Sequence, residues 1–111
     1  MNDLLKTAFD AMNDKQAENL VIIDMRKQNP FIDYFIIGSA SNHRKAHAII
    51  DEVVDKAEEA GFKVKSYDTS KDAKWLIADL DTVVCHIFVE DEREKYNLEG
   101  LWKDLPTLKK L

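Results

Sequence analysis

Two pairs of residues in this sequence have the chemistry of metal ligands. His43 and His47 are four apart, so a helix would place both imidazoles on one face, and Cys85 and His86 are adjacent. The spacing of a zinc protease, which adds a glutamate between its histidines, is missing. Cys85 and His86 fall in an alternating pattern that points them to opposite faces of a strand. We therefore interpret the histidines as a solvated helix face and Cys85 as a buried apolar side chain, and expect no metal or cofactor.

Nucleotidyl or phosphoryl transfer is the main alternative to a binding function. Gly38-Ser39 stands at a predicted strand end before a helix, where backbone N–H groups could hold a phosphate. Asp79 and Asp81 are the candidate carboxylates for the divalent ions that such transfer needs. The pattern places both in a tight turn near the other strand end, and a glycine-rich phosphate loop followed by Lys-Ser/Thr is missing. We expect no enzymatic activity.

Length and composition indicate one domain over residues 1–111. With 45% apolar and 33% charged residues, the chain has the composition of a folded globular protein. Its apolar runs are too short to span a bilayer, and residues 1–6 lack the basic start and apolar stretch of a secretory signal. A single cysteine rules out an internal disulfide and is typical of a reducing compartment. We expect a cytoplasmic protein with no membrane partner.

The net charge of −5 bears on the choice of partner. Proteins that bind nucleic acid gain most of their affinity by neutralising phosphates with a basic face. Here the polar side of the longest predicted helix is acidic, and the basic residues form no continuous stripe. Such a chain favours basic protein surfaces, and we expect little direct contact with nucleic acid.

Strands and helices alternate along the chain, which predicts an α/β fold. Apolar residues recur every three to four positions in residues 3–12 and 42–60, where Ser41 or Asn42 can cap the second helix and Gly61 can end it. Branched and alternating apolar residues predict strands at 20–25, 31–37, 62–65, 75–78 and 83–89, with a charged helical stretch from 90 onward. This order predicts a single domain with a mixed β-sheet packed against helices.

The last two predicted strands form a hairpin whose faces differ. A two-residue turn at Leu80-Asp81 would pair Trp75 with His86 and Ile77 with Val84. Alternation then places large rings on one face and small or aliphatic side chains on the other. The residues of the first face are Trp75, Ile77, Val84, His86 and Phe88, and those of the second are Leu76, Ala78, Val83, Cys85, Ile87 and Val89.

Two interpretations of the ring-bearing face remain open. A helix such as residues 3–12 could cover it, which would make it part of the core. Alternatively it is a docking surface centred on Trp75, because tryptophan is enriched in binding hot spots and monomers seldom expose such clusters. A surface of this kind could also join two copies of the free protein.

Three motifs resemble one known family. The first runs from Asp33 through Tyr34-Phe35-Ile36-Ile37 and Ser39 to Arg44. The second is the Trp75-to-Asp79 segment followed by Val83-Val84-Cys85-His86-Ile87-Phe88. The third joins Arg93, Tyr96-Asn97-Leu98-Glu99 and Leu101-Trp102. In this order and spacing they resemble the Iojap-like ribosomal silencing factors over residues 3–104.

The resemblance implies a nucleotidyltransferase-like fold without the catalytic motifs. It implies a translational repressor that binds ribosomal protein fourteen of the large subunit and sterically blocks subunit joining when nutrients are scarce. The expected contact residues are Trp75, Ile77, His86 and Phe88, with Tyr34, Ser39 and Arg44 as secondary candidates. The C-terminal residues Tyr96, Leu98, Leu101 and Trp102 are expected to pack against the core.

The chain departs from the family pattern at three turns. Asp81-Thr82 stands where the family usually has Gly-Asp, Ala40 replaces a common glycine, and Asp68-Thr69 replaces Glu-Gly. Aspartate tolerates the left-handed conformation that a tight turn requires, so we expect the hairpin to form.

Overall fold

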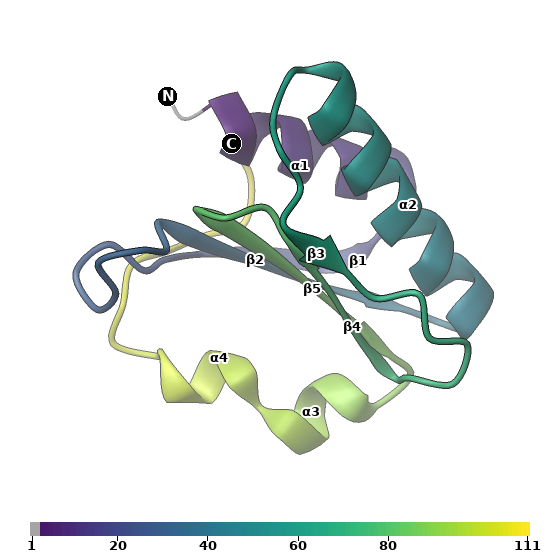
Figure 1. The fold of residues 1–111 in the computed structure, drawn as a ribbon. Helices are drawn as coiled ribbons and strands as arrows, with labels where there is room; N and C mark the ends of the chain where they lie inside the picture. The colour runs from purple at the N-terminus through teal and green to yellow at the C-terminus, as the bar shows by residue number, and fades with distance from the viewer. Residues whose placement is uncertain (1–2) are drawn as a thin grey trace.

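A six-stranded mixed sheet lies between two layers of helices in the computed structural model, which describes residues 3–111 (Figure 1). Helices α1 and α2 cover one face of the sheet, and the short helices α3 and α4 lie under the other. The elements in chain order are α1 (Asp3–Asp14), β1 (Glu18–Asp24), β2 (Tyr34–Ala40), α2 (His43–Glu59), β3 (Ser66–Tyr67), β4 (Trp75–Asp79), β5 (Val83–Val89), α3 (Glu92–Tyr96), α4 (Leu98–Leu101) and β6 (Thr107–Leu108). The predicted α/β domain with a mixed sheet is confirmed.

Helix α2 begins and ends as its sequence predicts, whereas α1 runs two residues beyond the predicted 3–12, and Asn2, one of its two candidate caps, lies outside the described residues. The side chain of Asn42 accepts a hydrogen bond from the backbone N–H of Lys45 at 2.8 Å and caps α2. At the other end Gly61 has φ +88, and the N–H of Phe62 reaches the carbonyl of Ala57 at 2.9 Å. This 6→1 bond over a left-handed glycine is the Schellman ending of a helix. Residues 46–57 of α2 bury one apolar face against α1 and the sheet.

The strand order β3-β4-β5-β2-β1-β6 puts the only described parallel pair, β2 and β5, in the middle of the sheet. Tyr34 pairs with Val83 and Ala40 with Val89, so β2 and β5 run side by side along their whole length. The chain leaves β2, crosses through α2, and returns by β3 and β4. Because this crossover packs α2 on one face, the central strands are buried on that side.

The aliphatic face of the hairpin lies under the long helices, as predicted. Leu76, Ala78, Cys85 and Ile87 share one buried cluster with apolar residues of α1 and α2. The idea that residues 3–12 cover the ring-bearing face is wrong, because α1 lies beside α2 on the aliphatic side. A two-helix layer buries one continuous apolar surface, which α1 alone could not offer on the other face.

The register of the hairpin differs by two residues from the prediction. Trp75 pairs with Phe88 and Ile77 with His86, so the two-residue turn is Asp81-Thr82 and not Leu80-Asp81. The Leu80 N–H donates to the carbonyl of Val83 at 2.9 Å and closes the turn. A shift of two residues preserves the side-chain alternation, so the composition of both faces is as predicted.

Other strands also differ from the prediction, and β1 spans Glu18–Asp24 rather than residues 20–25. β2 begins at Tyr34 rather than residue 31 and runs through Gly38-Ser39 to Ala40. The strand expected at 62–65 forms instead at Ser66–Tyr67, where two residues pair with β4. β6, which pairs with β1, was not predicted, because a two-residue strand carries no periodic signal. Within the described residues no helix has both the length and the apolar character needed to cross a bilayer.

Candidate partner-binding surface

Trp75 stands at the start of β4 in a stack of aromatic rings. Its ring centroid is 4.9 Å from Phe88 on β5 and 4.8 Å from Tyr96 on α3. Its indole N–H donates to Nδ1 of His86 at 3.1 Å. The tryptophan is partly exposed, so it is held rigidly from one side and remains accessible from the other. A pre-ordered, half-exposed aromatic side chain loses little entropy on binding.

His86 lies at the floor of this surface and is electrically neutral. It is 5% exposed, and burial lowers the pKa of its imidazole to about 4. Because Nδ1 accepts the Trp75 hydrogen bond, the neutral ring carries its proton on Nε2. Phe35 contacts the imidazole edge-to-face, with ring centroids 4.6 Å apart.

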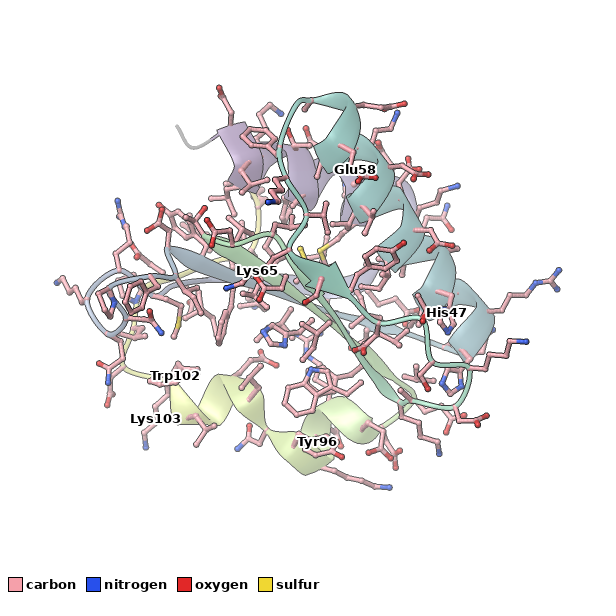
Figure 2. The ribbon with its side chains drawn as sticks, viewed as in Figure 1. His47, Glu58, Lys65, Tyr96, Trp102 and Lys103 are labelled. Atoms are coloured by element: carbon pink, nitrogen blue, oxygen red, sulfur yellow. The ribbon has the colours of Figure 1, made fainter. Side chains whose placement is uncertain are left out.

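The ring-bearing face is more covered than an open docking surface would be. Phe88 is 0% exposed and His86 is nearly so, so the expectation that this side of the hairpin is bare is wrong for both residues. Coverage comes from the C-terminal segment, not from α1: Leu98 and Trp102 join the cluster that contains Phe88. Figure 2 shows Tyr96 and Trp102 below the sheet, opposite His47 and Glu58 of α2. Trp75 and Ile77 keep partial exposure, and only they among the hairpin candidates present side-chain surface to a partner.

The C-terminal segment is partly packed and partly exposed. Leu98 is buried and Trp102 packs against the same cluster, as predicted. Tyr96 and Leu101 differ from the prediction, with 54% and 70% of their surfaces exposed. These two apolar side chains extend the exposed apolar area beyond the hairpin.

Arg93 of α3 joins the C-terminal segment to the sheet. Its Nε donates to Glu99 at 2.7 Å, and its Nη1 donates to the hydroxyl of Ser39 at 3.0 Å and to the carbonyl of Glu18 at 3.4 Å. In the ion pair with Glu99, the side chain of Arg93 is only 13% exposed. Ser39, a predicted contact residue, is therefore an acceptor that anchors α3 beside the docking surface.

Tyr34 and Arg44 do not lie with the other candidates. Tyr34 points to the opposite sheet face, where it packs against the helix-covered core under the guanidinium of Arg26, 5.4 Å from its ring. Arg44 is exposed on the first turn of α2. Because the side chains of neighbouring strand residues point to opposite faces of a sheet, the residues of the motif from Tyr34 to Arg44 cannot all lie on the face that carries Trp75.

The geometry separates the groups that phosphoryl transfer would need. Gly38-Ser39 is not a turn, because both residues lie within β2 and pair with Ile87 and Phe88. Asp79 ends β4 and Asp81 lies in the turn before β5, at the opposite end of the parallel β2–β5 pair from Gly38-Ser39. The carboxylate of Asp79 instead accepts the N–H of Asp81 at 2.9 Å, which is ordinary turn chemistry.

The candidate metal ligands are also occupied or apart. His47 Nε2 lies 2.5 Å from the carbonyl of Ser70, and His43 Nε2 contacts the carbonyl of Ala73. Cys85 is buried on the aliphatic face, where burial raises the pKa of its thiol to about 12. Across residues 3–111 no three His, Cys, Asp or Glu side chains gather as metal ligands.

Sequence reasoning missed the roles of Phe35 and Arg93 at this surface. Phe35 reaches His86 because β2 lies beside β5, a pairing between strands that are distant in sequence. Arg93 reaches Ser39 across 54 residues of chain. In the sequence Arg93 stands out only as part of a motif, and no neighbouring residue indicates its partners.

Comparison with known proteins gives the family directly. A family model described as "Ribosomal silencing factor during starvation" matches residues 1–111. A ribosomal silencing factor from Bacillus subtilis is 41% identical over 103 residues, which cover 93% of this chain and 87% of that protein. The name of that relative states the silencing of ribosomes, and the predicted resemblance is confirmed.

Solved structures are similar over the same length. A crystal structure from Bacillus halodurans is 37% identical, with a TM-score of 0.83 and coverage of 96% of each chain. A crystal structure from Chromobacterium violaceum, at 24% identity, has the same fold with a TM-score of 0.87 and covers 93% of this chain and 88% of that one. The chain therefore belongs to the ribosomal silencing factor family, whose members are ribosome-associated regulators of translation.

Proposed function

We propose that this protein represses translation by binding the large ribosomal subunit through ribosomal protein fourteen. Bound there, it sterically blocks joining of the small subunit when nutrients are limiting. The observation that carries the proposal is the match of the whole chain to a family described by ribosome silencing during starvation. The half-exposed aromatic surface around Trp75 supports a mechanism by docking rather than by catalysis.

Trp75 and Ile77 are the central contacts in this proposal. Both lie on β4 with their side chains on the same face and are partly exposed. Phe88 and His86 lie beneath them and act as a rigid support, since neither has much surface of its own to offer. Tyr96 of α3 contacts Trp75 at the margin of the same face and extends the contact.

The charge of the chain supports a protein partner. At a net charge of −5, the molecule is repelled by ribosomal RNA and attracted to basic ribosomal proteins. The aromatic surface itself is uncharged, so charge steers the encounter and apolar contact supplies affinity. Ser39 contributes indirectly through Arg93, and Tyr34 and Arg44 are at most peripheral contacts.

The test is co-sedimentation of the protein with purified large ribosomal subunits. Truncation of a central tryptophan costs about 2 kcal/mol of binding energy, so we expect Trp75→Ala to weaken binding roughly thirtyfold. Ile77→Asp is a second variant that leaves the ring stack in place. Tyr67→Ala is the matched control, because Tyr67 is an exposed aromatic residue on the neighbouring strand β3.

Folding of each variant is verified by thermal unfolding before binding is compared. Equal binding of Trp75→Ala, Ile77→Asp and wild type would place the contact elsewhere. Subunit-joining assays then measure the block itself, with small subunits added to preformed complexes. We also expect any homodimer of the free protein to use the same face, so Ile77→Asp should weaken dimerisation in analytical ultracentrifugation.

A further inference from the structure

An open pocket lies at one end of the molecule, on the side of the sheet that the long helices cover. Its floor is apolar and consists of Leu4 at the start of α1, Phe62 after α2 and Leu80 in the β4–β5 turn. Leu4 and Leu80 are buried members of the core cluster, and Phe62 packs against that cluster while half-buried. At this pocket the hydrophobic core therefore reaches solvent.

Hydrogen bonds hold two walls of the pocket together. The N–H of Lys65 donates to the carbonyl of Asp79 at 2.9 Å, which joins the segment after α2 to the end of β4. The carboxylate of Asp79 accepts the N–H of Asp81 at 2.9 Å and shapes the turn. The pocket has a volume of about 500 Å³, and small-molecule sites typically measure about 300–1,000 Å³. It is thus preformed and large enough for a small ligand.

Two lysines give the pocket a positive rim. Lys63 and Lys65 line it together with the acidic Asp81, and Figure 2 shows Lys65 on the segment that leads from α2 to β3. Neither lysine forms an ion pair with another residue of 3–111, although the chain carries a net charge of −5. Two lysines and one aspartate leave the described lining with one net positive charge. This arrangement matches a ligand that has an apolar body and a single negative charge.

The polar groups of the lining select among such ligands. A phosphomonoester such as a nucleotide carries about −1.5 to −2 at neutral pH, more than this rim compensates. Its base would also lose hydration without replacement, because Thr82 is the only uncharged polar side chain among the described residues of the lining. A carboxylate carries one charge and can accept hydrogen bonds from both ammonium groups. A hydrocarbon chain needs only the apolar contacts that the floor offers.

We propose that this pocket binds a medium-chain acyl carboxylate: the hydrocarbon chain lies on the apolar floor, and Lys63 and Lys65 hold the carboxylate at the mouth. The site goes beyond the proposed function and is separate from the docking surface. Its floor belongs to the cluster beneath the long helices, whereas Trp75 packs in the cluster on the other face of the sheet. A ligand in the pocket therefore leaves the Trp75 side of the hairpin open.

Octanoate is the probe, and its binding to the full chain is measured by isothermal titration calorimetry and by amide shifts in nitrogen-15 NMR. Octanol keeps the chain without the charge, and acetate keeps the charge without the chain. The double variant Lys63→Gln/Lys65→Gln removes the positive rim. Lys71→Gln/Lys103→Gln is the matched control, since it removes the same charge from two exposed lysines outside the lining.

The expected result is saturable binding of octanoate, with shifts confined to residue 4 and to the segments 62–65 and 80–82. Loss of both rim lysines should weaken binding about tenfold, and the control variant should stay within about twofold of wild type. Octanol and acetate should each bind at least about tenfold more weakly than octanoate.

Octanol that binds as tightly as octanoate, or an equal loss in the two double variants, would overturn the inference, because the rim lysines would then not recognise the carboxylate. Shifts centred on Trp75 and Ile77, or no saturable binding of octanoate, would equally overturn it. Thermal unfolding verifies that both variants fold. The comparison of octanoate with octanol uses the wild type alone, so it decides the question even where a variant is unfolded.

Discussion

Lowering the pH from 7 to 5 should destabilise this protein through His86. The imidazole is 5% exposed, and burial lowers the pKa of His86 from 6.5 to about 4. Between these values the unfolded chain binds a proton at residue 86 and the folded chain does not. Stability therefore falls as the pH drops below 6.5, and the loss is complete only below pH 4. Protonation would also place an N–H on Nδ1, where Trp75 now donates.

The size of the effect follows from the two pKa values. The gap between 6.5 and 4, at about 1.4 kcal/mol for each pH unit, corresponds to about 3 kcal/mol in total. By pH 5 the unfolded imidazole is almost fully protonated and the folded one is mostly neutral, so about 2 kcal/mol of the free energy of unfolding is lost. This amount is a large fraction of the stability of a small domain.

The assay is urea unfolding at pH 7, 6 and 5, followed by tryptophan fluorescence. His86→Gln is the control, since glutamine fills the same place without titrating, and the wild type minus variant difference removes the contribution of all other groups. A difference that stays constant from pH 7 to pH 5 would refute the reasoning, because it would mean that the imidazole is as easily protonated in the folded state as in the unfolded one.

Two further predictions concern the turn and the C-terminal segment. Asp81 has φ +76 in the hairpin turn, so Asp81→Gly should raise the free energy of unfolding by about 0.5–1 kcal/mol in urea. A decrease would indicate that the greater chain entropy of glycine in the unfolded state dominates, because the backbone N–H that donates to Asp79 is retained in the variant. Arg93→Ala removes charge-assisted hydrogen bonds to Glu99 and Ser39, so we expect a loss of about 1.5–3 kcal/mol and faster amide hydrogen exchange in residues 92–101. Unchanged exchange there would mean that packing of Leu98 and Trp102 alone holds the segment.

The C-terminal segment affects more than stability. It supplies Tyr96 to the Trp75 stack, and both Tyr96 and Leu101 of this segment are exposed. Because α3 is only five residues long and has no buried residue, its position depends on Arg93 and on the ring contacts. A change at Arg93 should therefore weaken partner binding as well as the fold.

Local sequence was sufficient for the two long helices and for the composition of the hairpin faces. Helix periodicity, the Asn42 cap and the left-handed Gly61 are interactions within a few residues, so the pattern contains them in full. Side-chain alternation is equally local, which is why the wrong turn at Leu80-Asp81 still led to the right division of faces. The three family motifs are also local sequence segments, so the sequence alone was sufficient to identify them.

Only the tertiary structure decided what covers each face. Both hairpin faces are apolar, so composition does not determine which of them α1 covers. In the structure α1 packs beside α2 on the aliphatic face, since two adjacent helices bury more surface together. The contacts of Arg93 with Ser39, and of His86 with Phe35, join residues about 50 positions apart and depend on strand order and on where α3 folds back. Burial, tautomer and pKa of His86 arise from that enclosure, because desolvation is a property of the surrounding atoms and not of the residue itself.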